Sequence, residues 1–293
     1  MTAIGFIGLG IMGSPMASHL LAAGHRVTGF DVHRPAVDLL AATGLVAAGS
    51  VTEAVGTAEV VITMLPDHPQ VEEVVLGAGG VLAAARPGTL LIDMSTIRPE
   101  TSLAVARAAA GHAVRVLDAP VSGGEVGAKQ ATLSIMVGGD EPDFAAARPL
   151  FETLGRTVVH VGGHGAGQVV KAANQLVVAG VFGLVSEAIV LLEASGVDAK
   201  AGLDVLAGGL AANRILDLKR ESMIAREFRP GFRIDLHHKD MGIVLDAARQ
   251  ANVALPLSGL VAQLVAAARA MGHGSLDHSA LLKVIEQVSG RAD

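Results

Sequence analysis

The chain of 293 residues contains no cysteine, no tyrosine and no tryptophan, and phenylalanine occurs only 7 times. Without cysteine there is no thiolate nucleophile, no disulfide and no cysteine-ligated zinc site. Without tyrosine a Tyr–Lys proton-donor pair is impossible, and so few aromatic rings argue against a base-stacking surface for nucleic acid. Any acid–base chemistry must therefore come from lysine, histidine, aspartate or glutamate.

Charge is also scarce, at 17% of residues, and the formal net charge of −6 gives no support to nucleic acid or an anionic membrane as partners. None of the 11 scattered histidines forms a His-Glu-x-x-His helix, so we expect no metal site. The longest apolar run, residues 176–185, is too short to span a bilayer. Met1 leads directly into a predicted strand, so we expect a cytoplasmic protein without a leader segment.

The beginning of the chain contains a complete strand–turn–helix–strand unit. A strand (residues 3–7) leads into a G-x-G-x-x-G loop and a helix, and a second strand (residues 26–30) ends at an aspartate 18 positions after the last glycine. The glycines let the backbone approach a pyrophosphate, the helix N-terminus presents N–H groups, and a carboxylate near this offset accepts bonds from ribose hydroxyls. A glycine loop alone often only turns the chain, but this context predicts a dinucleotide site made by Gly8, Gly10, Ile11, Met12, Gly13 and Asp31.

The carboxylate of Asp31 bears on which dinucleotide binds. It would repel a 2′-phosphate, which favours NAD(H) as the cofactor. Arg34 follows three residues later and could accommodate that phosphate, so NADP(H) stays possible.

Further apolar strands are predicted at residues 59–65, 89–94 and 114–118. Strands that alternate with helices predict an α/β Rossmann-type fold with a doubly wound, mainly parallel sheet. Ligands of such sheets bind beyond the carboxyl ends of the strands. The residues at these ends are Leu65, Pro66, Thr96 and the segment Ser122-Gly123-Gly124. That segment is either a simple turn or a set of hydroxyl and amide donors for a small carboxylate, and the residues alone leave both interpretations open.

Strand patterns disappear from about residue 163. We expect an NAD(P)-binding Rossmann domain over residues 1–162 and an all-α domain for substrate binding and dimerisation over residues 163–293. Residues 168–195 predict one long helix, whose apolar character from Leu176 onward implies burial and a subunit interface. Other helices are predicted at residues 199–210, 215–225, 239–251, 256–271 and 279–289.

Two lysines of the second half are candidates for chemistry. Lys171 and Asn174 are three residues apart and so share one face of the long helix. A lysine in an apolar helix is costly without a partner or a task, and although a snorkelling side chain is the simpler interpretation, the nucleotide-binding pattern favours a catalytic acid. Lys239 and Asp240 are either solvated charges or a lysine that reaches the cofactor or substrate, and composition leaves this undecided.

Four segments together resemble the signature motifs of the β-hydroxyacid dehydrogenase family: residues 5–13, 118–124, 167–175 and 239–240. They occur in the family's order and at its usual separations, and the resemblance covers essentially the whole chain. It implies a Rossmann domain followed by an all-α domain that pairs subunits into a homodimer or homotetramer. It also implies a small carboxylic acid as the substrate.

The resemblance assigns roles to matched residues. It implies that Lys171 is the catalytic lysine and that Asn174 orients the substrate or the lysine. The residues that would hold the substrate carboxylate are Ser122, Gly123 and Gly124. Those that would contact the cofactor outside the glycine loop are Leu65, Pro66, Thr96, Phe232 and Lys239.

Within the family, residues 208–211, 229–240 and 274–281 most resemble the branch that reduces tartronate semialdehyde to glycerate. The branch that oxidises 3-hydroxyisobutyrate shares the four signatures and is the nearest alternative. Residues 212–214 depart from close relatives, so Arg214 alters specificity if this loop touches the substrate. Imine reduction is a further alternative, which Lys171 opposes because imine reductases of this fold generally lack that lysine. A non-enzymatic nucleotide-binding module is opposed by the presence of Lys171, Asn174 and Ser122.

Overall fold

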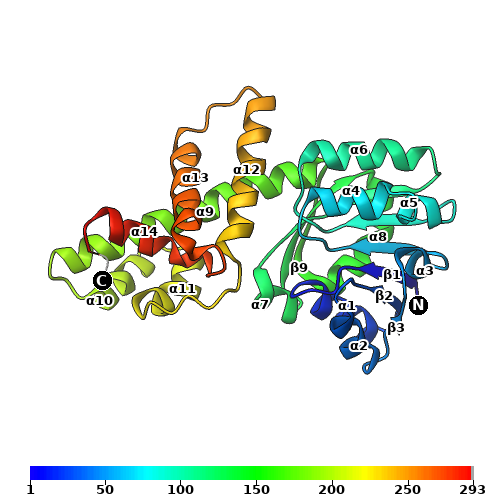
Figure 1. The fold of residues 1–293 in the computed structure, drawn as a ribbon, viewed down its shortest axis with the longest axis horizontal. Coiled ribbons are helices and arrows are strands. Elements are labelled where there is room, and N and C mark those ends of the chain that lie inside the picture. The colour runs from blue at the N-terminus through cyan, green and yellow to red at the C-terminus, as the bar shows by residue number, and fades with distance from the viewer. Residues whose placement is uncertain (292–293) are drawn as a thin grey trace. The chain divides into compact units, whose positions relative to one another are not determined.

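The computed structural model describes residues 1–291 and divides into two compact units, Met1–Lys171 and a second that begins at Ala172. The first unit is a sheet covered by helices and the second is helical (Figure 1). The last strand ends at Gly162, and the long helix α9 (Ala166–Ala194) starts in the first unit and continues into the second.

The first unit contains one sheet with the strand order β3-β2-β1-β4-β5-β6-β8-β7, and β9 pairs with β8. The pairs from β3 to β6 are parallel, β8 is antiparallel to β6 and β7, and β9 is parallel to β8. This confirms the doubly wound, mainly parallel sheet. Because β1 lies between β2 and β4, the topological switch point is at its carboxyl end. The strands are β1 Ala3–Ile7, β2 Arg26–Phe30, β3 Val46–Ala47, β4 Val60–Thr63, β5 Leu90–Asp93, β6 Arg115–Asp118, β7 Val121–Ser122, β8 Leu133–Gly139 and β9 Gly155–Gly162.

Helices cover both faces of this sheet. Consecutive strand residues point to opposite faces, so Phe6 packs in one core cluster with Met16, whereas Ile7 packs in another with Val71. Figure 1 shows α4, α5 and α6 on one side and α1 and α2 on the other. The helices are α1 Gly13–Ala22, α2 Arg34–Ala41, α3 Val51–Val55, α4 His68–Leu76, α5 Val81–Ala84, α6 Pro99–Ala110, α7 Gly124–Lys129 and α8 Glu141–Leu154.

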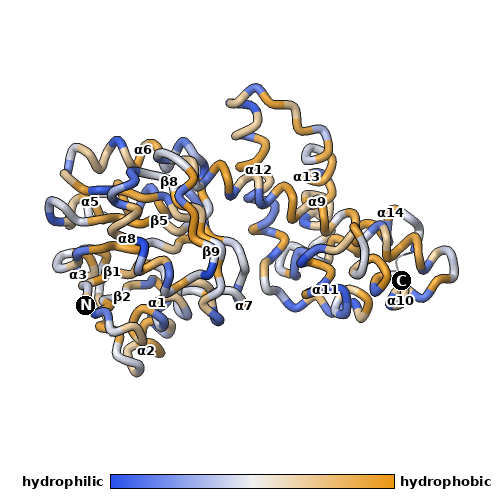
Figure 2. The backbone as a smooth tube through the Cα atoms, turned by 180° about the vertical axis from the view of Figure 1, so that it is seen from behind, coloured by the Kyte–Doolittle hydropathy of each residue, from blue (hydrophilic) through white to orange (hydrophobic). Residues whose placement is uncertain are grey.

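The second unit is built around α9, along which Figure 2 shows a run of hydrophobic residues. Phe182, Val185 and Ile189 of α9 form one buried cluster with residues of the surrounding helices. The predicted helix at residues 239–251 starts earlier than expected, at Ile234, so Lys239 lies inside the helix. The other elements are α10 Ala199–Ala207, α11 Arg214–Ile224, α12 Ile234–Gln250, α13 Pro256–Ala268, the π-helical turn Arg269–His273, the 3-10 turn His278–Ala280 and α14 Leu281–Val288.

Helix α9 is long and apolar enough to cross a membrane by length and composition alone. The expectation based on residues 176–185 was too narrow, because the apolar helix continues well beyond that run. The buried side chains of α9 form the core of the second unit, and 44% of its most apolar 18-residue window is buried. A core helix of a helical domain has these same properties.

Candidate active site

The glycine-rich loop joins β1 to α1 at the switch point of the sheet. Gly8 has a φ of +96°, and a Cβ there would lie 2.3 Å from the carbonyl oxygen of Met64. A Cβ at Gly13 would lie 1.8 Å from the carbonyl oxygen of Gly8, whereas one at Gly10 would meet no atom within 4 Å. The fold therefore requires glycine at Gly8 and Gly13, and Gly10 leaves open space beside the start of α1. This space fits the phosphates of a dinucleotide, which the helix N-terminus attracts.

Asp31, at the carboxyl end of β2, is bonded to the glycine loop. Its Oδ2 accepts from the Leu9 amide (2.6 Å) and its Oδ1 from the His33 amide (2.7 Å). Each carboxylate oxygen has more than one lone pair, so this aspartate can also accept bonds from ribose hydroxyls. Arg34 donates Nη1 to the carbonyl oxygen of Ala48 (2.7 Å). The residues present at this end of β2 thus fit a dinucleotide, and binding of its ribose by Asp31 stays a prediction.

The remaining two residues of the predicted loop site have different surroundings. Ile11 is exposed, and Met12 packs partly buried against the core of the sheet. Both immediately precede α1, where the first backbone N–H groups of a helix have no partner within it.

The ends of β4 and β5 are joined by a hydrogen bond. The Leu65 amide, which follows β4, donates to Oγ of Ser95 at 2.9 Å. Asp93, the last residue of β5, accepts hydrogen bonds from Oγ1 of Thr63 (2.7 Å) and from the Ser95 amide (3.2 Å). Burial raises the pKa of Asp93 to about 6, against the lowering effect of these hydrogen bonds. The segments that carry Pro66 and Thr96 are thereby held together.

Lys171 lies in the second turn of α9 and is buried, with 6% of its surface exposed. The start of α9 is held by Asp118, whose carboxylate accepts from the amides of Gly165 (2.7 Å) and Gln168 (3.1 Å). Burial raises the pKa of Asp118, and these two amides oppose the rise. The first N–H groups of a helix usually donate to the side chain of its own N-cap residue. Here Asp118, at the end of strand β6, provides the acceptor for the start of α9 instead. The sequence placed Asp118 in a signature motif without indicating this function.

The segment Ser122-Gly123-Gly124 is a tight turn from β7 into α7. Ser122 pairs with Ser134 across the antiparallel β7–β8 ladder, and the φ angles of Gly123 and Gly124 are +127° and +59°. Only glycine adopts two such consecutive conformations readily, so the turn requires both residues. Binding of a carboxylate by this turn stays a prediction.

In the second unit, Asp240 fixes the orientation of two amide side chains. Its carboxylate forms an ion pair with Lys239 (Nζ–Oδ1 3.0 Å) and accepts from Nε2 of Gln175. Since a carboxylate can only accept, Oε1 of Gln175 faces Asn174 and accepts from its Nδ2 at 2.8 Å. Asp240 is buried and the Lys239 side chain is 17% exposed, which excludes the solvated interpretation of this pair.

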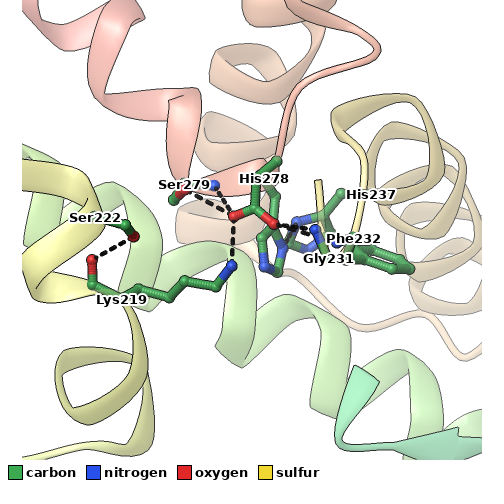
Figure 3. A network of polar contacts seen from close by, with 8 residues as sticks. Lys219, Ser222, Gly231, Phe232, His237, His278 and Ser279 are labelled. Carbon is green, nitrogen blue, oxygen red and sulfur yellow. Dashed lines mark hydrogen bonds and ion pairs between the residues drawn. The ribbon is translucent and has the colours of Figure 1, made fainter. Parts of the chain in front are cut away.

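Phe232 lies in the loop before α12 (Figure 3). Asp277 holds this loop. Oδ2 of Asp277 accepts from the amides of Gly231 (2.8 Å) and Phe232 (3.2 Å), and Oδ1 accepts from Nζ of Lys219 (2.9 Å). Burial raises the pKa of Asp277, but His278, Ser279 and Lys219 outweigh burial and hold this pKa at about 2. Asp277 was not predicted as a site residue, and its place in a family-like segment was the one signal for it.

His237 and His278 form a pair next to Phe232, joined through their Nδ1 atoms at 3.1 Å. Nε2 of His237 donates to the carbonyl oxygen of Gln175 (3.3 Å), so in the neutral ring Nδ1 accepts and His278 donates. The ring of Phe232 packs edge-on against both, at 5.7 and 5.3 Å between centroids. The loop of Phe232 and the segment of Gln175 are thereby connected through the buried ring of His237 and the partly buried ring of His278.

A glycine loop at the switch point, an aspartate at the end of β2 and a buried lysine in the helix that follows the sheet define an NAD(P)-dependent oxidoreductase. Comparison with known proteins agrees. Residues 3–162 match the family model described as the NAD binding domain of 6-phosphogluconate dehydrogenase. Residues 165–285 match the one described as the NAD-binding domain of NADP-dependent 3-hydroxyisobutyrate dehydrogenase.

Individual relatives span the whole chain. It is 43% identical to 2-hydroxy-3-oxopropionate reductase of Escherichia coli K12, over 97% of both chains. It is 40% identical to 3-hydroxyisobutyrate dehydrogenase of Pseudomonas aeruginosa, over 97% of this chain and 98% of that one. The solved structure of Mycobacterium tuberculosis 3-hydroxyisobutyrate dehydrogenase with L-serine matches with a TM-score of 0.88 and 40% identity, covering 97% and 99% of the two chains. The chain therefore belongs to the β-hydroxyacid dehydrogenase family.

The first prediction compares two glycines of the loop. Gly10→Ala should leave the melting temperature unchanged but weaken NADH binding about tenfold or more, because its methyl group occupies the space for the phosphates. Gly13→Ala should instead destabilise the fold by about 1–3 kcal/mol, because its Cβ meets a carbonyl oxygen. Fluorescence titration with NADH and thermal unfolding measure both effects. Unchanged NADH affinity of Gly10→Ala would show that the phosphates bind elsewhere.

A second prediction concerns the pH dependence of stability. Because folding raises the pKa of Asp93 from 3.8 to about 6, its contribution to stability is complete below about pH 4 and is lost as the pH rises through 6. The loss amounts to at most about 3 kcal/mol. Asp93→Asn, which is neutral throughout, should therefore gain stability over wild type as the pH rises. Urea unfolding between about pH 4 and 8 measures this, with the exposed Asp140→Asn as control; a difference that does not vary with pH would contradict it.

Proposed function

We propose that the chain reduces tartronate semialdehyde (2-hydroxy-3-oxopropanoate) to glycerate with NAD(H), and that Lys171 is the general acid. The observation that carries the proposal is a buried lysine in a helix whose start Asp118 holds by two hydrogen bonds. Burial of an ammonium group carries a free-energy cost that a partner or a function must offset. The 43% identity to the Escherichia coli reductase named for this substrate supports the choice.

The chemistry requires a hydride and a proton. The dinucleotide, when bound, supplies the hydride that reduces the aldehyde carbon. Lys171 stabilises the charge that develops on the aldehyde oxygen and donates the proton that completes the primary alcohol. The Ser122 hydroxyl and the amides of Gly123 and Gly124 bind the substrate carboxylate. Thr96, Phe232 and Lys239 act on the cofactor.

Asn174 offers a basis for substrate choice. Because its Nδ2 donates to Gln175, its acceptor Oδ1 is on the opposite side of the amide. We propose that this Oδ1 accepts a hydrogen bond from the C2 hydroxyl of tartronate semialdehyde. Methylmalonate semialdehyde has a methyl group at that carbon and would leave this acceptor without a partner. Sites built to bond a hydroxyl discriminate strongly against analogues that lack it.

The second candidate is the dehydrogenation of 3-hydroxyisobutyrate. The 40% identity to the Pseudomonas aeruginosa enzyme and the similarity to the Mycobacterium tuberculosis structure favour it. Absorbance of NADH and NADPH should be followed in parallel with tartronate semialdehyde and methylmalonate semialdehyde. Faster loss of NADH with tartronate semialdehyde is the expected result, and preference for methylmalonate semialdehyde would select the second candidate.

A third prediction tests the lysine. Lys171→Ala should lower kcat by about 10²–10⁴-fold and leave NADH affinity nearly unchanged, because the proton donor is lost but the glycine loop is intact. Lys171→Met keeps most of the buried volume and should lose as much activity. Steady-state kinetics with the exposed Lys200→Ala as control measures this. Near-wild-type turnover of Lys171→Met would remove the lysine from the mechanism.

We also propose that a second copy of the chain covers α9. Val177, Leu184 and Leu191 repeat every seven residues along this helix and are 58%, 67% and 67% exposed. Residues seven apart lie two turns apart on nearly the same helix face, so these three side chains form one exposed apolar stripe, a surface against which a helix of a second copy can pack. Exposed apolar surface of this kind marks interaction sites of soluble proteins.

A fourth prediction follows for the oligomeric state. Leu184→Glu should convert a dimer or tetramer into smaller species at micromolar concentration, because it places a carboxylate within the apolar contact. Light scattering after size-exclusion chromatography measures the mass. Leu39→Glu, at a site that is 72% exposed in the first unit, is the control and should not change it. A monomeric wild-type protein would contradict the proposal.

A further inference from the structure

The side chain of Gln168 bonds the loop of Thr96 at two points. Its Nε2 donates to the carbonyl oxygen of Ser95 (2.9 Å), and its Oε1 accepts from the amide of Ile97 (3.1 Å). The glutamine is 1% exposed, whereas Thr96 between the two bonded residues stays partly exposed. The amide thus fixes the backbone on both sides of Thr96 and leaves this residue accessible.

The backbone of Gln168 is bonded to a second segment of the site. Its amide donates to Oδ2 of Asp118 (3.1 Å), and the amide of Gly165 donates to Oδ1 (2.7 Å). Asp118 ends β6 and lies three residues before the strand that carries Ser122. Gln168 therefore connects the Thr96 loop, through Asp118, to the segment that leads to Ser122.

Lys171 follows Gln168 by three residues and lies on the same face of α9. Gln168, Lys171 and Gln175 form a buried polar stripe on this apolar helix, with 1%, 6% and 4% exposure. A helical turn moves as a rigid body, so a displacement of Gln168 displaces Lys171 as well. Such a displacement matters for catalysis, because misplacing a reacting group by about 1 Å reduces the rate about 10²-fold.

We infer that Gln168 is a positioning residue that couples the Thr96 loop to the turn of α9 that carries Lys171. Order imposed on the loop by bound dinucleotide is passed through the Gln168 amide to the lysine. The inference rests on the roles given to Thr96 and Lys171 in the proposed function. A glutamine that only stabilised the fold would hold the same bonds without this transfer.

The test compares Gln168→Leu, which removes both side-chain bonds, with wild type and with Gln70→Leu, an exposed control on α4. Amide hydrogen exchange of residues 94–98 and 165–173 is measured with and without NADH, together with NADH affinity and kcat. NADH should slow exchange in both segments of wild type and of the control. In Gln168→Leu it should slow exchange only in residues 94–98, with NADH affinity about tenfold weaker and kcat about 10–100-fold lower.

Gln168→Glu provides a second test that remains valid if Gln168→Leu does not fold. The ionised carboxylate still accepts from Ile97 but repels the carbonyl oxygen of Ser95, and the protonated acid donates to it again. The difference in NADH affinity from wild type should therefore shrink as the pH falls from about 8 to about 5.5. A glutamine whose bonds to Ser95 and Ile97 do not affect the Thr96 loop predicts no such recovery.

Two results would overturn the inference. One is NADH-dependent protection of residues 165–173 in Gln168→Leu equal to that in wild type. The other is unchanged NADH affinity and kcat despite a lower melting temperature. The exchange and affinity measurements involve no aldehyde, so a wrong substrate or an inactive role for Lys171 would be seen in the kinetic assays alone.

Discussion

The Asp118 carboxylate, buried where β6 ends, is the acceptor on which the position of α9 depends. Two glycines leave room for this carboxylate. A Cβ at Gly138 would lie 2.6 Å from Oδ1 of Asp118, and a Cβ at Gly167 would lie 2.8 Å from its Oδ2. The amides of Gly165 and Gln168 offset part of the free-energy cost of burying the charge. Lys171, three residues after Gln168, lies in the part of α9 that these bonds hold.

At each end of the polar stripe of α9, a buried aspartate accepts a hydrogen bond from a glutamine. Asp118 fixes the backbone of Gln168, and Asp240 fixes the side chain of Gln175. Each glutamine then orients a further group of the proposed site, the Thr96 loop in one case and the Asn174 amide in the other. Buried amides and carboxylates are costly unless every group has a partner, so such a network selects one arrangement.

Prediction from sequence succeeded where patterns are local. The strands at residues 3–7 and 26–30 have the bounds expected, and the long helix was predicted to within two residues at its start. Strands β8 and β9 were not predicted, although Leu133, Ile135 and Val137 of β8 are buried at alternate positions. Both strands contain glycine, and β8 runs antiparallel to β6 and β7 but parallel to β9, which no periodic pattern encodes.

The nucleotide-binding unit, the family and the shared face of Lys171 and Asn174 follow from the order of amino acids alone, because each depends on short spacings. The roles of Asp118, Gln168 and Asp240 in holding these parts became visible in the folded chain. Their bonds to Gly165, Ile97 and Gln175 join residues 47, 71 and 65 positions apart. The packing of strands and helices decides which distant groups form such hydrogen bonds. The neighbouring residues in the sequence do not contain that information.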